Sequence, residues 1–158
     1  LKPFRMALLV ANQRTGSAVT RWGPTEQMFE DALQAAFAAV HGTTRQLQFT
    51  LYQCWNGQVP TLEELNSHDA ALITGSKYSA YEDGQYDWMR ELEALVTDPK
   101  RRVWIFGVCF GHQLALRALG ATVEKHPSGR EMGAASVDII DGEMQELLGR
   151  TTISVIEN

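Results

Sequence analysis

Hydrophobic and polar positions along the chain divide it into short apolar runs and longer segments with helical spacing. The apolar runs predict four strands, at 5–12, 46–54, 69–74 and 102–108. Three segments with apolar residues three and four positions apart predict helices, at 24–40, 87–96 and 110–119. The run at 102–108 has no polar face, which indicates a parallel sheet buried on both sides. Alternation of strands and helices predicts an α/β sandwich.

The remaining segments are shorter and more polar. The segments at 13–23 and 59–68 predict loops, the second with one helical turn. Further strands are predicted at 121–126, 132–140 and 151–156, with a short helix at 142–149. The chain contains no repeat, low-complexity tract or linker, so we expect one domain over 1–158.

Composition narrows the function classes. The net charge of −5 disfavours nucleic acid or an anionic membrane surface as a partner, because both need a basic face. No apolar run reaches the length of a membrane span, and residues 1–10 fit a first buried strand better than a signal peptide. Two cysteines do not make a disulfide framework, so a reducing, cytoplasmic location is expected.

Cys109 is the candidate nucleophile, because it lies where the last apolar run meets a helix. Gly107 and Gly111 stand two residues to either side of it. A tight strand-to-helix turn exposes such a side chain, and flanking glycines allow close approach of backbone and substrate. The positive end of the following helix favours the thiolate. A free cysteine is more commonly buried and inert, so this motif alone leaves both interpretations open.

The same corner offers hydrogen-bond donors for a developing oxyanion. The N–H of Phe110 follows the sulfur, and Gly75 or Ser76 follows a neighbouring strand. Strand ends of a parallel sheet meet at one edge, so these N–H groups are expected to converge. Cys54 has no glycine frame and is predicted to be structural. Trp104, inside an apolar strand, is predicted to be part of the core.

Two segments resemble class I, triad-type glutamine amidotransferases. They are GVCFGHQLALRALGATVEKHPSGREMG at 107–133, similar to the nucleophile segment, and DAALITGSKYSAYEDGQYDWMRELEAL at 69–95, similar to the oxyanion loop. The nearest branch contains the GMP-synthase-like amidotransferases of fungi and plants and the γ-glutamyl peptidases. The resemblance implies a flavodoxin-like, three-layer α/β fold with a mostly parallel central sheet, and no cofactor.

The resemblance also implies roles for individual residues. Cys109 would attack glutamine or a γ-glutamyl amide and form a thioester. The oxyanion and loop contacts would come from Gly75, Ser76 and Phe110, and the glutamyl group would be held by Gln113 and Gly111. Gln113 lies one helical turn after Cys109, which is consistent with that position. Without the resemblance, Gln113 would be interpreted as a partly exposed helix residue.

No histidine in the chain is an obvious partner for Cys109. His41 is predicted to be a solvated residue at the end of a helix, while His68 and His126 are predicted to be surface residues. His112 is close in sequence, but its position at the start of a helix does not ensure that the ring reaches the sulfur. The resemblance implies that a histidine at this position is common in the family and is not the catalytic one. The family's catalytic His-x-Glu pair lies beyond the matched region, and no histidine follows His126.

Three explanations for this departure stay open. The chain is a truncated piece of an enzyme, a non-catalytic relative that binds a glutamyl ligand or a partner, or a protein in which His112, His126 or another subunit completes the site. Truncation would expose apolar surface, which predicts a homo-oligomer or a partner chain such as a synthase. The spacing of histidines, cysteines and carboxylates predicts no metal site, and there is no phosphate-binding loop of the P-loop type.

Overall fold

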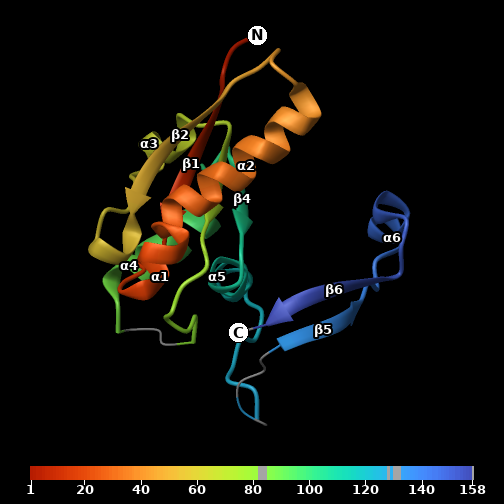
Figure 1. Cartoon of the computed structure of the whole chain (residues 1–158). Coiled ribbons are helices and arrows are strands. Elements are labelled where there is room, and N and C mark those ends of the chain that lie inside the picture. Colours follow the sequence, from red (N-terminus) through yellow and green to blue (C-terminus); the bar gives the residue numbers. More distant parts are fainter. Residues whose placement is uncertain (82–84, 128, 130–132, 158) are drawn as a thin grey trace. The chain divides into compact units, whose positions relative to one another are not determined.

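A computed structural model of the chain describes residues 1–81, 85–127, 129 and 133–157. These residues form two units, Leu1–Val123 and Glu124–Asn158, which run from red to cyan and on to blue in Figure 1. Parts of both segments that carry the family resemblance, at 82–84, 128 and 130–132, lie outside the described residues. The predicted nucleophile and the predicted oxyanion donors all lie within the first unit.

The first unit contains a four-stranded parallel sheet, as the apolar runs predict. Its strands are β1 (Phe4–Val10), β2 (Leu47–Gln53), β3 (Ala70–Ile73) and β4 (Trp104–Gly107), in the order β2-β1-β3-β4. The register aligns Leu9 with Ile73 and Ile73 with Gly107. The carboxyl ends of β1, β3 and β4 therefore meet at one edge of the sheet, where ligands of such folds bind.

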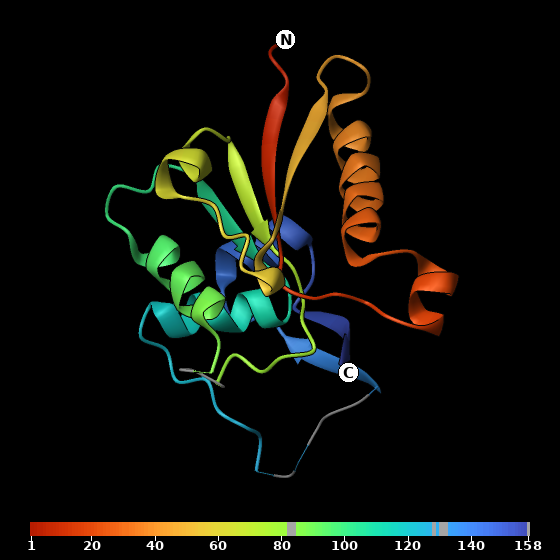
Figure 2. The ribbon, with the colours of Figure 1, turned by 90° about the vertical axis from the view of Figure 1, so that its left-hand side faces the viewer.

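Helices cover both faces of this sheet. The helices of the unit are α1 (Ser17–Trp22), α2 (Thr25–His41), α3 (Leu62–Asn66), α4 (Asp87–Thr97) and α5 (Phe110–Ala118), and a 3₁₀ turn, η1, spans Cys54–Asn56. Figure 2 shows α2, in orange, on one side of the sheet, with green α4 and cyan α5 on the other. The predicted three-layer α/β fold is confirmed. The prediction of a loop at 13–23 is wrong in part, because α1 lies within this segment. The sequence does not indicate this helix, since all of its residues except Val19 are exposed and it has no apolar face.

Each face of the sheet has its own apolar core. On one face, Leu8 and Val10 of β1 pack against Phe29, Leu33 and Phe37 of α2. The opposite face is larger and lies under α4 and α5. Its buried residues include Leu9 and Ile73 from the sheet, Leu92 from α4, and Phe110 and Leu114 from α5. Alternate residues of β1 and β3 point into opposite cores, which explains why both strands are apolar on both faces.

Strand β4 departs from the prediction that all strands are buried. Trp104 is 77% exposed and Phe106 is 56% exposed, so the prediction that Trp104 is a core residue is wrong. β4 lies at an edge of the four-stranded sheet, and α2 packs against β1 and β2 instead. The register pairs Trp104 with Ala70 and Phe106 with Leu72, on the face that carries α2. An apolar run does not distinguish an edge strand from a central one.

The second unit consists of a β-hairpin with an inserted helix. Strands β5 (Gly133–Asp138) and β6 (Thr152–Glu157) are antiparallel, and α6 (Gly142–Leu148) lies between them in sequence. Asp141 caps α6 by accepting a hydrogen bond from the Met144 N–H at 2.8 Å. The strand predicted at 121–126 is wrong, because this exposed segment has no ladder partner among the described residues. None of the helices in the described part of the chain is long and apolar enough to cross a membrane.

Candidate active site

Cys109 occupies a strained turn between β4 and α5. Its φ of 52° and ψ of −108° make it the one non-glycine residue with positive φ in the described part of the chain. Such a conformation costs on the order of 1–3 kcal/mol, and it persists only where the surrounding structure fixes it. Cys109 is also the N-cap residue of α5, and its side chain is exposed. The turn therefore presents the thiol to solvent at the positive end of a helix.

Two glycines make this turn sterically possible. A Cβ at Gly111 would lie 2.3 Å from the carbonyl oxygen of Ile73, and a Cβ at Gly107 would lie 2.4 Å from the Gly111 carbonyl carbon and the His112 nitrogen. Neither distance is compatible with a side chain. The first turn of α5 thus packs directly on the backbone of β3 and β4. This contact gives a physical reason for both glycines of the sequence motif.

Side-chain hydrogen bonds fix the neighbouring strand ends. The buried Thr74 hydroxyl accepts a hydrogen bond from the Ala11 N–H at 2.9 Å and donates to the Gly75 carbonyl at 3.1 Å. The Ser76 hydroxyl donates to the Ala11 carbonyl at 2.7 Å and accepts from the Tyr78 N–H at 3.1 Å. The hydroxyl of Ser76 is therefore committed to holding the loop after β3 against the end of β1. Only its backbone N–H is left for the predicted oxyanion contact.

The predicted oxyanion residues lie beside Cys109. A Cβ at Gly75 would stand 3.7 Å from the Cβ of Cys109, an ordinary contact distance. Phe110 is the first residue of α5, where backbone N–H groups have no partner inside the helix. Its ring is buried and packs at 5.7 Å between centroids against Trp88. The structure thus brings Gly75 and Phe110 to the thiol, and their role in binding an oxyanion stays a prediction.

The two residues predicted to hold the glutamyl group differ in their surroundings. Gly111 is buried, and its N–H donates to the Val108 carbonyl at 3.0 Å, so its observed contacts are those of packing. Gln113 is exposed, and its N–H donates to the Cys109 carbonyl at 3.0 Å. The side chain of Gln113 is therefore available at the same end of α5 as the thiol. Substrate binding by either residue stays a prediction.

Of the three histidines in the first unit, only His112 lies at the same edge of the sheet as the thiol. The ring of His41 packs on Phe37, which in turn packs on Phe4 at the start of β1, so His41 lies at the amino edge of the sheet. His68 precedes β3 and lies at that edge too. His112, on α5, is at the carboxyl edge with Cys109. Within the described residues of the first unit, 1–81 and 85–123, no hydrogen bond joins the thiol to a histidine.

His68 corrects one prediction. It is 7% exposed and not a surface residue. Its Nδ1 lies 2.9 Å from the Glu64 carbonyl oxygen, and its ring meets Tyr52 edge-on at 6.1 Å. The polar residues around it in the sequence hide this packing. His41, in contrast, is exposed as predicted, and His126 belongs to the second unit.

The second cysteine provides a contrast inside the same molecule. Cys54 is fully buried, and burial raises the pKa of its thiol to about 12. A thiol with such a pKa stays protonated and unreactive near neutral pH. The prediction that Cys54 is structural agrees with these surroundings. Cys109 is the exposed thiol of the chain.

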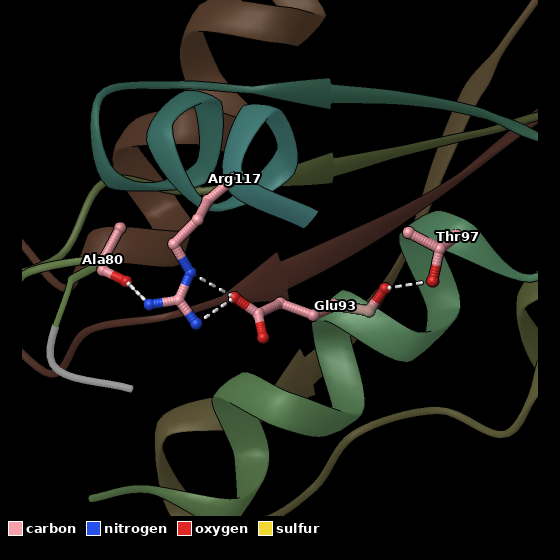
Figure 3. Close-up of polar contacts among 4 residues, drawn as sticks. All are labelled: Ala80, Glu93, Thr97 and Arg117. Carbon is pink, nitrogen blue, oxygen red and sulfur yellow. Dashed lines mark hydrogen bonds and ion pairs between the residues drawn. The ribbon is translucent and has the colours of Figure 1, made fainter. Parts of the chain in front are cut away.

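Arg117, which the sequence analysis did not single out, contacts both α4 and the loop after β3. Arg117, in the last turn of α5, donates a hydrogen bond to Glu93 of α4 and forms an ion pair with the same carboxylate oxygen, and its third nitrogen donates to the carbonyl of Ala80 (Figure 3). The signal in the sequence was a single charge inside the apolar helix pattern LALRALG. Because the side chain of Arg117 is only 19% exposed, its charge requires a partner.

Other kinds of site receive no support near Cys109. Among residues 1–81, 85–127, 129 and 133–157 no three histidine, cysteine or carboxylate side chains are grouped so that they could hold a metal ion. Two surface hollows, of about 420 and 300 Å³, have no predicted site residue in their walls. The exposed thiol on its strained turn is therefore the feature around which the site is built.

A parallel α/β sheet with a cysteine on a strained strand-to-helix turn defines the class of proteins that carry a nucleophile elbow. A family model for class-I glutamine amidotransferases matches residues 31–154, and the chain belongs to this family. A glutamine amidotransferase-like protein of Schizosaccharomyces pombe is 26% identical over 157 residues, which cover 96% of this chain and 62% of the relative. Gamma-glutamyl peptidase 3 of Arabidopsis thaliana is 31% identical over 93 residues, which cover 58% of this chain and 36% of that protein.

A solved structure supports the fold. A glutamine amidotransferase from Thermotoga maritima superposes with a TM-score of 0.63 at 18% identity, and the match covers 97% of this chain and 59% of that one. The chain thus spans about three fifths of the length of this protein and of the fission-yeast relative. The flavodoxin-like α/β fold implied by the resemblance is confirmed.

Proposed function

We propose that this chain carries the thiol site of a cysteine-dependent amidohydrolase that acts on glutamine or a γ-glutamyl amide. The conformation of Cys109 carries the proposal, because a strained, exposed, glycine-framed thiol at a helix start is costly to maintain without a use for it. Membership of the amidotransferase family and the similarity to γ-glutamyl peptidases support the glutamyl substrate class. We place the activity in the cytoplasm.

The proposed reaction proceeds through a thioester. The thiolate of Cys109 attacks the γ-carbonyl carbon, and the developing oxyanion accepts hydrogen bonds from the N–H groups of Phe110 and of Gly75 or Ser76. The C–N bond then breaks, and the leaving nitrogen takes up a proton as it departs as ammonia or an amine. Water hydrolyses the thioester, which releases the γ-carboxylate and regenerates the thiol. The reaction uses no cofactor, and a separate synthase would be the acceptor if the ammonia is transferred.

His112 is the proposed proton donor to the leaving nitrogen. It is the histidine of the first unit at the same sheet edge as Cys109, and it lies one helical turn away in α5. A second candidate function is supported by the lack of a thiol–histidine hydrogen bond in the described residues of the first unit. In that case the chain binds glutamyl ligands or a protein partner at the same site without turnover.

The reactivity of the two thiols tests the proposal. The protein would be treated with a chloromethyl ketone analogue of glutamine at pH 6–9, and the modified peptides would be quantified by mass spectrometry. We expect Cys109 to react at least a hundredfold faster than Cys54, with protection by millimolar glutamine. Cys54, whose pKa is raised to about 12, is the internal control.

Turnover separates the two candidate functions. Ammonia release from glutamine, abolished in Cys109→Ser and slowed at least tenfold in His112→Gln, would support the amidohydrolase. Fast, glutamine-protected labelling without ammonia release would support the binding function. Equal labelling of Cys109 and Cys54, with no effect of glutamine, would contradict a glutamyl site of either kind.

A further inference from the structure

The Arg117 side chain connects three segments that surround the candidate site. Its Nε donates to Glu93 Oε1 at 2.9 Å, and a second guanidinium nitrogen lies 2.7 Å from the same oxygen (Figure 3). The remaining terminal nitrogen donates to the Ala80 carbonyl oxygen at 2.6 Å. Glu93 lies on α4, and Ala80 lies in the loop between β3 and α4. The side chains of Arg117 and Glu93 are each only 19% exposed.

The Ala80 carbonyl accepts this hydrogen bond at a buried position of the loop. Ala80 is buried at 1% exposure, and a buried carbonyl without a hydrogen bond is destabilising. A hydrogen bond from a charged donor is stronger than one from a neutral donor. The planar guanidinium can also bind Glu93 and Ala80 at the same time, which the single ammonium of lysine does less well. Arg117 therefore fixes the middle of the loop as well as the packing of α4 on α5.

The loop that Arg117 holds is the one that faces Cys109. It starts at Gly75, next to the thiol, and Ser76 fastens it to the end of β1 through the Ala11 carbonyl. Between Ser76 and Ala80, the ring of Tyr78 packs against the tilted ring of Tyr86, with centroids 4.7 Å apart, and meets Trp88 edge-on at 5.7 Å. The loop is thus anchored at Ser76 from β1 and at Ala80 from α5, the same helix that begins at the nucleophile.

We propose that Arg117 is a positioning residue that holds the loop after β3 in the place needed to bind the glutamyl group beside Cys109. The inference rests on the proposed function and adds to it a residue that does not itself touch the substrate. It predicts that loss of the guanidinium weakens recognition of a glutamyl ligand and leaves the intrinsic reactivity of the thiol unchanged. A purely structural ion pair between α4 and α5 would not separate these two properties.

Two reagents distinguish positioning from general damage. The chloromethyl ketone analogue of glutamine needs both the thiol and the glutamyl site, whereas iodoacetamide needs only the thiol. The main variant is Arg117→Met combined with Glu93→Leu, which removes both charges of this ion pair together, so that Glu93 is not left as an unpaired carboxylate at a mostly buried position. Arg90→Met is the matched control, because it removes an exposed ion pair with Asp87 at the start of α4.

In the double variant we expect labelling of Cys109 by the glutamine analogue to slow at least tenfold, through a higher half-saturating concentration. Iodoacetamide labelling should stay within twofold of the unsubstituted protein, and Arg90→Met should match that protein with both reagents. Arg117→Lys should recover part of the loss. If the double variant does not fold, Arg117→Lys carries the test and must slow the glutamine analogue at least threefold.

Three results would overturn the inference. The double variant could be labelled by the glutamine analogue as fast as Arg90→Met, or it could lose reactivity toward both reagents equally. The third result would be that the glutamine analogue labels Arg117→Lys as fast as it labels the unsubstituted protein. Failure of the proposed function would give a different result, which can be measured before any substitution is made. Glutamine would then not protect Cys109 of the unsubstituted protein from labelling, and the inference would be refuted together with the proposed function.

Discussion

Gly111→Ala tests the backbone contact on which the elbow depends. A Cβ at this position would lie 2.3 Å from the Ile73 carbonyl oxygen and 2.8 Å from the carbonyl carbon, whereas ordinary contacts begin near 3.4 Å. Helix α5 or strand β3 must therefore move by about 1 Å. The clash lies between backbone atoms of two regular elements, which cannot shift independently of their neighbours. Overpacking of this kind costs about 1–3 kcal/mol. Because no flexible side chain can absorb the clash, we expect about 3 kcal/mol, which lowers Tm by about 6–12 °C for a chain of this length.

Gly75→Ala provides the matched control for this substitution. It adds the same methyl group at the same edge of the sheet, but the nearest atoms would be 3.7 and 3.8 Å away. We expect its free energy of unfolding to stay within about 0.5 kcal/mol of the unsubstituted chain. Urea unfolding followed by circular dichroism measures both variants. Equal stability of Gly111→Ala and Gly75→Ala would refute the close approach of α5 to β3.

Two further predictions concern Cys54 and strand β4. Burial raises the pKa of the Cys54 thiol from its ordinary value of 9.0 to about 12 in the folded chain. The free energy of unfolding that this thiol contributes is therefore complete below pH 9. It is lost as the pH rises from 9 toward 12, by about 1.4 kcal/mol per pH unit. Cys54→Ala should remove this part of the pH dependence in urea unfolding between pH 8 and 11, and an unchanged slope would contradict it. The exposed Trp104 and Phe106 should promote self-association at micromolar concentration. Light scattering should give a lower mass for Trp104→Ser/Phe106→Ser, and a monomeric unsubstituted chain would count against the prediction.

The fold was predictable for the helices with strong apolar periodicity and for the strands that are buried on both faces of the sheet. Strands β1 and β3 and helices α2, α4 and α5 all lie within the predicted ranges, give or take two residues. The exposure of Trp104 was not predictable, because strand order depends on contacts between segments far apart in the sequence. The run containing Trp104 has the composition of a central strand, yet α2 covers the other half of that face. Helix α1 was missed because it has no apolar stripe.

The candidate site was predictable only in its local part. Gly107, Cys109 and Gly111 form a motif of five residues, and the steric demands of the turn require both glycines. The contacts that hold the facing loop join residues far apart: the Ser76–Ala11 hydrogen bond spans 65 positions, and the Arg117–Ala80 hydrogen bond spans 37. Nothing in the spacing of these residues indicates that they meet. The isolated charge of Arg117 in an apolar pattern was the one sign of such a contact.

The sheet topology also limits where a proton donor for Cys109 can come from. In a parallel sheet all carboxyl ends lie at one edge, so His41 and His68, at the amino edge, are separated from the thiol by the length of the strands. His68 is further restrained by its hydrogen bond to the Glu64 carbonyl. Within the first unit the choice therefore reduces to His112, which makes His112→Gln the substitution that separates a self-sufficient site from one completed by residues outside this unit.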